Sequence, residues 1–271
     1  MAKGFQQTPG IDYLETFSPV VKSSTIRVVL SLAVTYGWDI QQVDVNNAFL
    51  NGELVETVHM LQPEGFADSQ NPHHVCKLTK ALYGFKQAPR AWFEKLKHAL
   101  LSWNFVNSVA DSSLFIYKKD EQVMYVLVYV DDILLTGNDA DLVNKIVQQL
   151  NTQFALKTLG SLKYFLGFEV FRNDSGIHMS QEKYAKDLLV KTGMMDSKSC
   201  PTPMAVGTKL SFEDSELFDK PTLYRSTIGA LQYLTLSRPD IAYSVNKLRK
   251  TFTQPGTAAT LYELRASINN Q

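Results

Sequence analysis

Two adjacent carboxylates interrupt the most apolar part of the chain, and this feature constrains the fold more than any other. The run VMYVLVYV ends at Val130, Asp131 and Asp132 follow, and the run ILLTG begins at once. Such runs predict two strands that a sheet buries or half-buries. Ionised neighbours there repel each other and lose hydration, so the pair needs a compensating cation or donor. A divalent metal ion would supply it, although a solvated hairpin turn that uses Asp as its turn former is the simpler alternative.

A third acid lies upstream, near the end of the predicted strand 38–45. Asp44 alternates there with Ile40 and Gln42. If this strand pairs beside the later hairpin, three carboxylates meet at one end of a sheet, and two metal ions about 3.5–4 Å apart need such a cluster. Magnesium prefers carboxylate, water and phosphate oxygens, and no Cys or His stands nearby. Taken alone, without the downstream pair, Asp44 is better explained as a residue that caps the end of its strand.

The remaining patterns predict a mixture of helices and hairpins. A hydrophobic content of 45% with 20% charged residues excludes wholesale disorder, and no apolar run approaches the ~20 residues that a membrane helix needs. The order of elements lacks regular βαβ alternation, which favours an α+β fold. Residues 196–222 are polar and acidic and read as a linker or long loop. We predict helices at 24–36, 90–103, 139–151, 181–192, 222–237 and 239–252, and hairpin strands at 113–119 with 123–130 and at 163–172 with 177–181.

Positive charge is uneven along a chain whose 27 Lys and Arg residues balance 27 Asp and Glu residues. This balance excludes a polycation but not a local basic groove. Between residues 77 and 97, six cations face only Glu94, a net charge of +5, and Tyr83, Phe85 and Trp92 are interleaved with them. Such a segment suits phosphate tracking with base stacking, although a solvated helix face accounts for many such clusters. The predicted nucleic-acid patch consists of Lys77, Lys80, Lys86, Arg90, Lys95 and Lys97.

The acidic pair also carries a family resemblance. The stretch Tyr129–Asp132, within VLVYVDDILLTG, resembles the metal-binding signature of reverse transcriptases. Six further blocks resemble the copia-type retrotransposon branch, in the family's order and over residues 2–255. They are IDYLETFSPVVKSSTIR, VDVNNAFLNG, VCKLTKALYGFKQAPRAWF, LGSLKYFLGFEV, SQEKYAKDLL and YRSTIGALQYLTLSRPDIAY.

The resemblance implies a fold, a reaction and a cofactor. The fold would be an α+β polymerase palm and fingers with an antiparallel palm sheet, in a domain over 1–205. A linker and a small helical, thumb- or connection-like segment would fill 206–271. The enzyme would be an RNA-directed DNA polymerase, a nucleotidyltransferase that joins a deoxynucleoside triphosphate (dNTP) to a primer 3′-hydroxyl. Two Mg²⁺ ions, for which Mn²⁺ could substitute, would bind Asp44, Asp131, Asp132 and the Val45 carbonyl.

Further site residues follow from the same resemblance. Phe49 occupies the position of the steric gate that excludes a 2′-hydroxyl, although a core Phe would look the same. Lys157 corresponds to a lysine that protonates pyrophosphate, and an exposed strand Lys is the commoner explanation. Leu166 and Gly167 correspond to the primer grip, where apolar hairpin packing is the alternative. The residues expected near template and nucleotide are Gln87, Ala88, Pro89, Tyr129 and Val130.

Other readings remain open beside the polymerase. An inactive, truncated retrotransposon relic would fold and bind nucleic acid without extending a primer, and a two-metal nuclease would share the carboxylates but leave Phe49 and the GFKQAPR segment unexplained. The resemblance also implies that fingers sequence precedes Met1 and that a ribonuclease H domain follows, so we expect a fragment of a Pol polyprotein. The expected partners are an RNA or DNA template–primer and dNTPs, with no membrane, in cytoplasmic virus-like particles.

Overall fold

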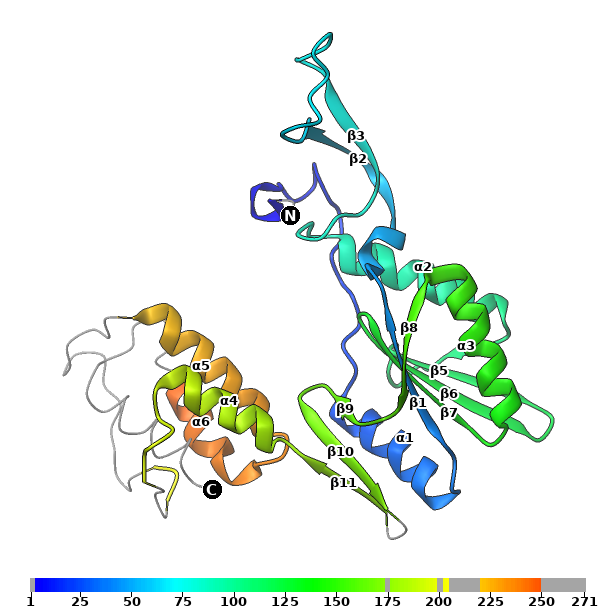
Figure 1. Ribbon diagram of the computed structural model, residues 1–271, viewed down its shortest axis with the longest axis vertical. Helices are drawn as coiled ribbons and strands as arrows, with labels where there is room; N and C mark the ends of the chain where they lie inside the picture. The colour runs from blue at the N-terminus through cyan, green and yellow to red at the C-terminus, as the bar shows by residue number, and fades with distance from the viewer. Residues whose placement is uncertain (1–2, 174–175, 199–201, 205–219, 250–271) are drawn as a thin grey trace. The chain divides into compact units, whose positions relative to one another are not determined.

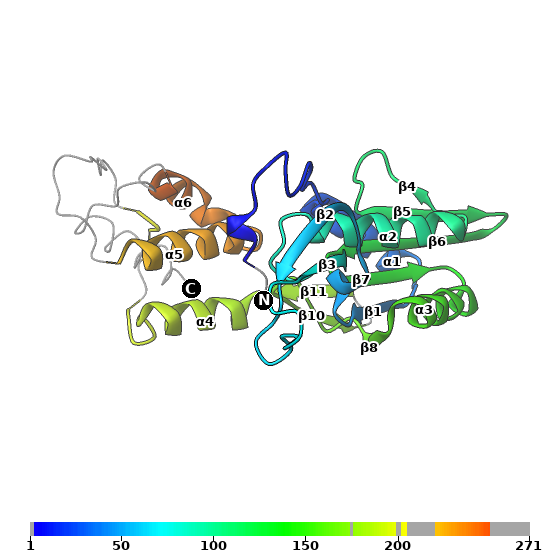
Figure 2. The same cartoon turned by 90° about the horizontal axis from the view of Figure 1, so that it is seen from above.

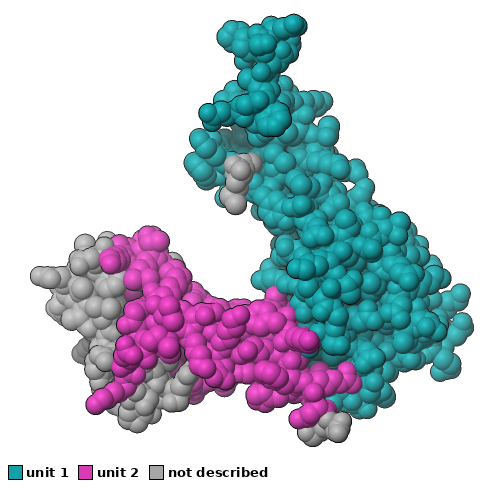
Figure 3. Space-filling view, viewed as in Figure 1, with its two compact units in different colours: residues 1–162 teal, residues 163–271 magenta. Residues whose placement is uncertain are grey.

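The structure is a computed structural model that describes residues 3–173, 176–198, 202–204 and 220–249. It divides into two compact units, residues 1–162 and 163–271 (Figure 3). The sequence-based division after residue 205 is a different boundary and stays a prediction. We describe each unit by itself.

The first unit is built on a six-stranded sheet in which every neighbouring pair is antiparallel. The strand order is β4-β5-β6-β7-β1-β8, so β1 comes from early in the chain and inserts between the hairpin strand β7 and the later β8 (Figures 1 and 2). The strands are β1 (Ile40–Val45), β4 (Val106–Asn107), β5 (Leu114–Lys119), β6 (Gln122–Tyr129), β7 (Asp132–Gly137) and β8 (Leu156–Ser161).

Two long helices cover one face of this sheet. Helix α2 (Ala88–Ser102) carries Pro89 in its first turn, and Asp139 caps α3 (Ala140–Phe154) by accepting from the backbone N–H groups of Asp141 and Leu142. Their buried apolar side chains pack with alternate residues of the central strands into one core. The strand residues of that core are Val43, Val45, Phe115, Met124, Val126, Val128, Ile133 and Leu135.

Alternation sends the other strand side chains to the opposite face. Gln42 and Asp44 of β1 and Asp132 of β7 therefore point away from α2 and α3, because their neighbours Val43, Val45 and Ile133 belong to the core. This is the face on which the carboxylates lie.

The first unit also contains elements that the sequence patterns did not predict. Strands β2 (Glu53–Leu61) and β3 (Val75–Lys80) form a two-stranded ribbon that is not part of the six-stranded sheet (Figure 1). The short 3-10 helices η1 (Gly4–Gln6) and η2 (Ala48–Asn51) were not predicted either, whereas α1 (Ser23–Thr35) is the helix predicted at 24–36.

The second unit joins a three-stranded sheet to a helical core. Its strands are β9 (Tyr164–Phe165), β10 (Phe168–Asn173) and β11 (Gly176–Ser180), in the order β11-β10-β9, and its helices are α4 (Glu182–Thr192), α5 (Pro221–Leu234), η3 (Pro239–Ile241) and α6 (Ala242–Arg249). Buried residues of α4, α5 and α6, including Tyr224, Ile228 and Leu231, form the core. The prediction of one strand over 163–172 is wrong, because Leu166 and Gly167 form a turn between β9 and β10.

All six predicted helices are present, and residues 250–252 of the last one lie outside the described residues. The mixed α and β composition with an antiparallel sheet confirms the expected fold class, while the palm and fingers labels stay predictions. In the described part of the chain, no helix has both the length and the apolar character to cross a membrane.

Candidate active site

The two acids of the hairpin lie in and directly after a strained turn. Tyr129 pairs with Asp132, so Val130 and Asp131 form the tip of the β6–β7 hairpin. Val130 has a φ of 55°, which is a genuine outlier for a β-branched residue and persists only where the surroundings hold it. The Trp92 Nε1–H of α2 donates to the Val130 carbonyl at 2.6 Å, and the Val45 N–H donates to the Asp131 carbonyl at 3.0 Å. The tip is therefore anchored to both α2 and β1.

Asp44 lies directly across from Asp132 in the register of β1 and β7. Directly opposed residues of an antiparallel pair project to the same face of the sheet, so these two carboxylates are neighbours. The Gln42 Nε2–H donates to Oδ1 of Asp132 at 3.2 Å. The pairing of the early strand with the later hairpin, on which the carboxylate hypothesis depended, is thus present.

Electrostatics links the three acids. Burial raises the pKa of Asp44, and the charge of Asp131 raises it further, while Lys157 opposes the shift. Burial also raises the pKa of Asp132; the hydrogen bond from Gln42 lowers it, and the charges of Asp131 and Asp44 add to the increase. Lys157 pairs with Asp44 in the register of β8 and β1, so the predicted lysine does lie beside an acid. A cation bound here would relieve a repulsion that the fold itself creates.

The three carboxylates are ligands of the type that a hard cation prefers, although they do not converge into a coordination site. Within the described ranges, no three Asp, Glu, His or Cys side chains form a group that could hold a metal ion. The oxygen ligands that Mg²⁺ prefers are nevertheless available from Asp44, Asp131 and Asp132. The residues therefore fit the metal by chemistry, and its ligation, including the Val45 carbonyl, stays a prediction.

The expected gate residue has an aromatic partner that sequence reasoning assigned to a different role. Phe49 lies in η2, and its ring centroid is 4.6 Å from that of Tyr83. Burial raises the pKa of the Tyr83 hydroxyl, and the charges of Asp131 and Asp44 raise it further, so this hydroxyl lies within the field of the acids. The sequence indicates Tyr83 only as one of the aromatic residues of the basic segment. Its position at the start of the YGFKQAPR stretch was the available signal.

Residues 87–89 form the junction between the N-terminal segment and α2. Gln87 is 2% exposed, donates to the Asp12 carbonyl and accepts from Gln7 Nε2, both at 3.1 Å. Ala88 is fully buried, and Pro89 starts the helix. These two hydrogen bonds tie the Gln87 side chain to the N-terminal segment. A contact of residues 87–89, Tyr129 or Val130 with template or nucleotide stays a prediction.

The predicted basic patch is less positive in three dimensions than along the sequence. Arg90 pairs with Glu15 at 2.7 Å, Lys95 pairs with Glu53, and Lys97 pairs with Glu94 at 3.6 Å. Glu15 and Glu53 come from distant parts of the chain, which is why a count over residues 77–97 missed them. Lys77, Lys80 and Lys86 are exposed and keep the patch assignment as a prediction.

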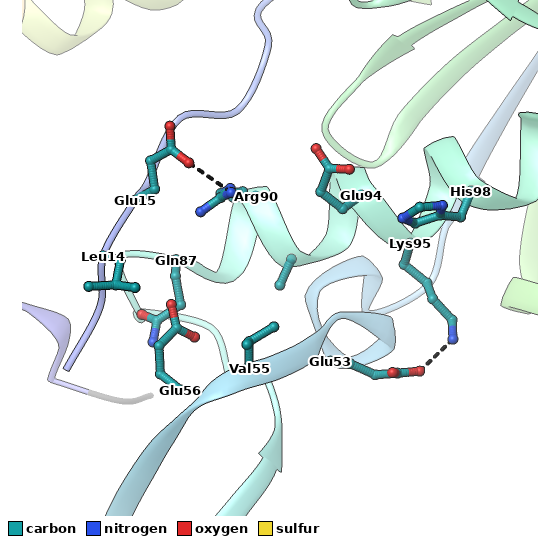
Figure 4. Close-up of a pocket in the computed structure, with 11 residues that line it drawn as sticks. Leu14, Glu15, Glu53, Val55, Glu56, Gln87, Arg90, Glu94, Lys95 and His98 are labelled. Carbon is teal, nitrogen blue, oxygen red and sulfur yellow. Dashed lines mark hydrogen bonds and ion pairs between the residues drawn. The ribbon is translucent and has the colours of Figure 1, made fainter. Parts of the chain in front are cut away.

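A pocket of about 420 Å³ lies where these ion pairs form, between the N-terminal segment, β2 and α2 (Figure 4). Its lining combines four glutamates with Arg90, Lys95 and His98, so acidic and basic groups are mixed along its walls. The lining residues are Leu14, Glu15, Glu53, Val55, Glu56, Gln87, Arg90, Ala91, Glu94, Lys95 and His98.

The proposed stacking role of Trp92, which lies on α2 as well, is wrong, because that ring is 1% exposed and packs edge-on against Phe154 in the core.

The expected primer grip lies in the second unit. Leu166 and Gly167 form the two-residue turn between β9 and β10, and both have positive φ values. A non-glycine residue in the left-handed region costs about 1–2 kcal/mol, so the backbone of this turn is strained at Leu166. Contact of this turn with a primer stays a prediction.

Comparison with known proteins adds an independent result. The family model described as reverse transcriptase (RNA-dependent DNA polymerase) matches residues 1–206. The retrovirus-related Pol polyproteins from transposons RE1 and RE2 of Arabidopsis thaliana are 51% and 49% identical to this chain over 255 residues, which is 94% of its length. The Pol polyprotein from transposon TNT 1-94 of Nicotiana tabacum is 38% identical over 266 residues, again 94% of the chain.

The chain spans 17%, 18% and 20% of the lengths of these three relatives. The family match runs through the whole sheet of the first unit, including β1 with Asp44, β7 with Asp132 and the β6–β7 turn with Asp131. Five of the six blocks quoted from the sequence lie within the residues that the family model matches, and the sixth, at 224–243, lies beyond them. The chain belongs to the reverse transcriptase (RNA-dependent DNA polymerase) family, in its copia-type retrotransposon branch.

Proposed function

We propose that this chain carries the polymerase site of a copia-like reverse transcriptase. In the reaction, a primer 3′-hydroxyl oxygen attacks the α-phosphorus of a dNTP, the new phosphodiester bond forms, and pyrophosphate leaves. The observation that carries the proposal is the register of β1 with β7, which sets Asp44 opposite Asp132 beside the hairpin tip that holds Asp131. The family match supports the same assignment.

Asp44, Asp131 and Asp132, with the Val45 carbonyl, would hold two Mg²⁺ ions, for which Mn²⁺ could substitute. Bound divalent ions supply Lewis acidity and charge neutralisation to the reacting phosphates. The raised pKa values of Asp44 and Asp132 support this, since both carboxylates stand in a partly buried, mutually repulsive cluster. Positive charge near these carboxylates stabilises their ionised forms, and both a bound metal ion and the Lys157 side chain would supply it.

Two further side chains would contact the incoming dNTP or the pyrophosphate product. Phe49, backed by Tyr83, would stand under the sugar of the incoming dNTP and exclude a 2′-hydroxyl. Lys157, which faces Asp44 across the β1–β8 pair, would donate a proton to pyrophosphate. The partners would be an RNA or DNA template–primer and dNTPs. The six-stranded sheet would be the palm, and cytoplasmic virus-like particles would be the setting.

Primer extension on an RNA template tests the proposal. Wild type should extend a DNA primer with Mg²⁺ and dNTPs, and Asp131→Asn should lose at least about 100-fold of the rate, because one charged group at the reacting phosphates is removed. Asp120→Asn is the matched control. It makes the same chemical change in the turn at the other end of β6, where the φ of 51° is one that Asn tolerates.

Each result of this assay decides between the alternatives. Equal extension by wild type and Asp131→Asn would contradict the catalytic assignment. Salt-dependent binding of primer–template with no extension by wild type would identify an inactive relic. Cleavage of the nucleic acid with Mg²⁺ and no dNTPs would identify a nuclease.

A further inference from the structure

The turn between β9 and β10 has a backbone that its own sequence does not favour. Leu166 and Gly167 have φ values of 49° and 72°, and Phe165 pairs with Phe168 across them. Two successive left-handed residues suit a two-residue hairpin loop, but Leu is a poor residue for the first position. Backbone strain of this kind persists only where neighbouring groups hold it, and it is concentrated at functional positions.

One side chain of α5 holds this turn. The Tyr233 hydroxyl donates to the Leu166 carbonyl, 67 residues away in sequence. A Cβ atom added to Gly167 would lie 2.9 Å from Cε1 of the Tyr233 ring, closer than such atoms approach one another. Gly167 is therefore required for two reasons, its positive φ and the tyrosine ring against its Cα.

A second aromatic ring supports the first. The Tyr184 ring of α4 packs against that of Tyr233 with centroids 5.3 Å apart and an interplanar angle of 65°. The Tyr184 hydroxyl is 3.4 Å from the Ala230 carbonyl of α5, which it meets as a donor. Tyr233 is only partly buried and does not belong to the core formed by Tyr224, Ile228 and Leu231. Its hydroxyl contacts the turn, and its ring contacts Tyr184.

We propose that Tyr233 is a positioning residue: it clamps the Leu166–Gly167 turn in the strained shape with which the turn contacts the primer strand. This inference rests on the proposed function, because it takes the turn to be the primer grip. It adds a residue from α5 whose hydroxyl and ring fix the turn. The clamp acts on primer binding and leaves the acids of the first unit unchanged.

The full chain with Tyr233→Phe tests the clamp, and Tyr224→Phe is the matched control. Tyr224 lies on the same helix and donates its hydroxyl to the Leu248 carbonyl at 2.9 Å, so each variant loses one hydroxyl bond to a backbone carbonyl and keeps its ring. The measurements are the dissociation rate of a fluorescent RNA–DNA primer–template without dNTPs, the KM for primer–template, kcat and the thermal midpoint.

Tyr233→Phe should raise the primer–template dissociation rate and KM about fivefold, the effect of one hydrogen bond, with kcat within about twofold of wild type. Tyr224→Phe should lower the thermal midpoint and leave dissociation and KM within about twofold. Gly167→Ala should reproduce the Tyr233→Phe effect, and the double variant should add little to either, because the two residues act through one contact.

Two results would overturn the inference. If Tyr233→Phe matches wild type in dissociation and KM, or if both Tyr→Phe variants change them equally, the hydroxyl does not position the turn. If instead wild type neither binds nor extends the primer–template, the proposed function itself fails and the clamp fails with it. Extension by wild type but not by Asp131→Asn in the same series separates these outcomes.

Discussion

At the scale of single residues, Phe49 gives the most direct test of substrate choice. Its ring is held against Tyr83 beside the acids, so a smaller side chain should open space for a 2′-hydroxyl. Phe49→Val should raise ribonucleotide incorporation relative to deoxynucleotide incorporation by about 10- to 100-fold, a range set by the discrimination available from small changes in an apolar contact. The measurement is kcat/KM for one dNTP and its ribonucleotide counterpart in primer extension.

Phe49→Tyr is the control for that measurement, because it keeps the bulk of the ring and should keep the discrimination. An unchanged ratio in Phe49→Val would show that Phe49 is a packing residue only. The structure leaves room for that outcome, since Phe49 also packs against the main core.

The residues of the site differ in how far sequence could identify them. Asp131 and Asp132 could be identified as candidates from sequence, because charged side chains between two apolar strands need a compensating partner. Asp44 could be identified from the alternation of residues in its predicted strand. The Tyr83 hydroxyl could not be placed near these acids without the tertiary fold. The ion pairs of Arg90 with Glu15 and of Lys95 with Glu53 were hidden for the same reason, since the partners lie 75 and 42 positions apart in the printed sequence.

At the scale of elements, Asp111 joins the start of α1 to the loop before β5. Its carboxylate accepts from the Lys22 N–H at 2.9 Å, the Thr25 hydroxyl at 2.6 Å and the Ser113 N–H at 3.0 Å. No side chain caps α1 from within its own segment, so this distant acid supplies an acceptor for its N-terminus. Asp111→Ala should lower the free energy of unfolding by about 1–3 kcal/mol, because the buried Ser113 N–H and two partly buried hydrogen bonds lose their acceptor. Urea denaturation measures this.

The same residue gives a pH dependence. Burial alone would raise the pKa of Asp111, but the bonds from Thr25, Lys22 and Ser113 outweigh it and hold the pKa below its ordinary value. The stabilisation is therefore present above the unfolded-state pKa and is lost as pH falls through the lower folded-state pKa. The difference in unfolding free energy between wild type and Asp111→Asn should shrink as the solution is acidified from pH 7. A difference that stays constant with pH would contradict the assignment.

Elements with strong periodicity were predictable, and those without it were not. The six helices and the β5–β6–β7 run follow from apolar spacing. Burial alternates along β2 of the β2–β3 ribbon, but the apolar Val55 and Leu61 lie on its exposed face and Glu56 on the other, so apolar spacing did not predict this strand. The break at Leu166 is the opposite case, because the apolar run KYFLGFEVFR is typical of one strand, and the contact of the turn with Tyr233 appears only in the tertiary structure.

At the scale of the whole molecule, a chain of zero net charge can attract nucleic acid only through its local potential, so the proposed binding depends on where the cations lie. Replacing the exposed Lys77, Lys80 and Lys86 by Gln should reduce the slope of log K against log salt concentration for primer–template binding by about 1–3, since each lost phosphate contact removes about 0.9. Fluorescence anisotropy from low to moderate KCl measures the slope.

The control for this experiment is a triple variant of the exposed Lys118, Lys119 and Lys145, each changed to Gln. Lys118 and Lys119 lie at the end of β5 that is distant from the acids, and the change in net charge is the same. Equal slopes for the two triple variants would show that binding follows total charge, and the predicted patch would then be wrong.

The sequence by itself determined the family, the helices and the identity of the three acids, because apolar spacing, charge in a buried strand and colinear motifs are all local properties. The tertiary structure alone decided that β1 lies between β7 and β8, that Tyr83 backs Phe49, that glutamates neutralise half of the basic patch, and that Tyr233 holds a strained turn. These are contacts between residues far apart in the chain, and their energies depend on burial and distance, which exist only once the chain is folded.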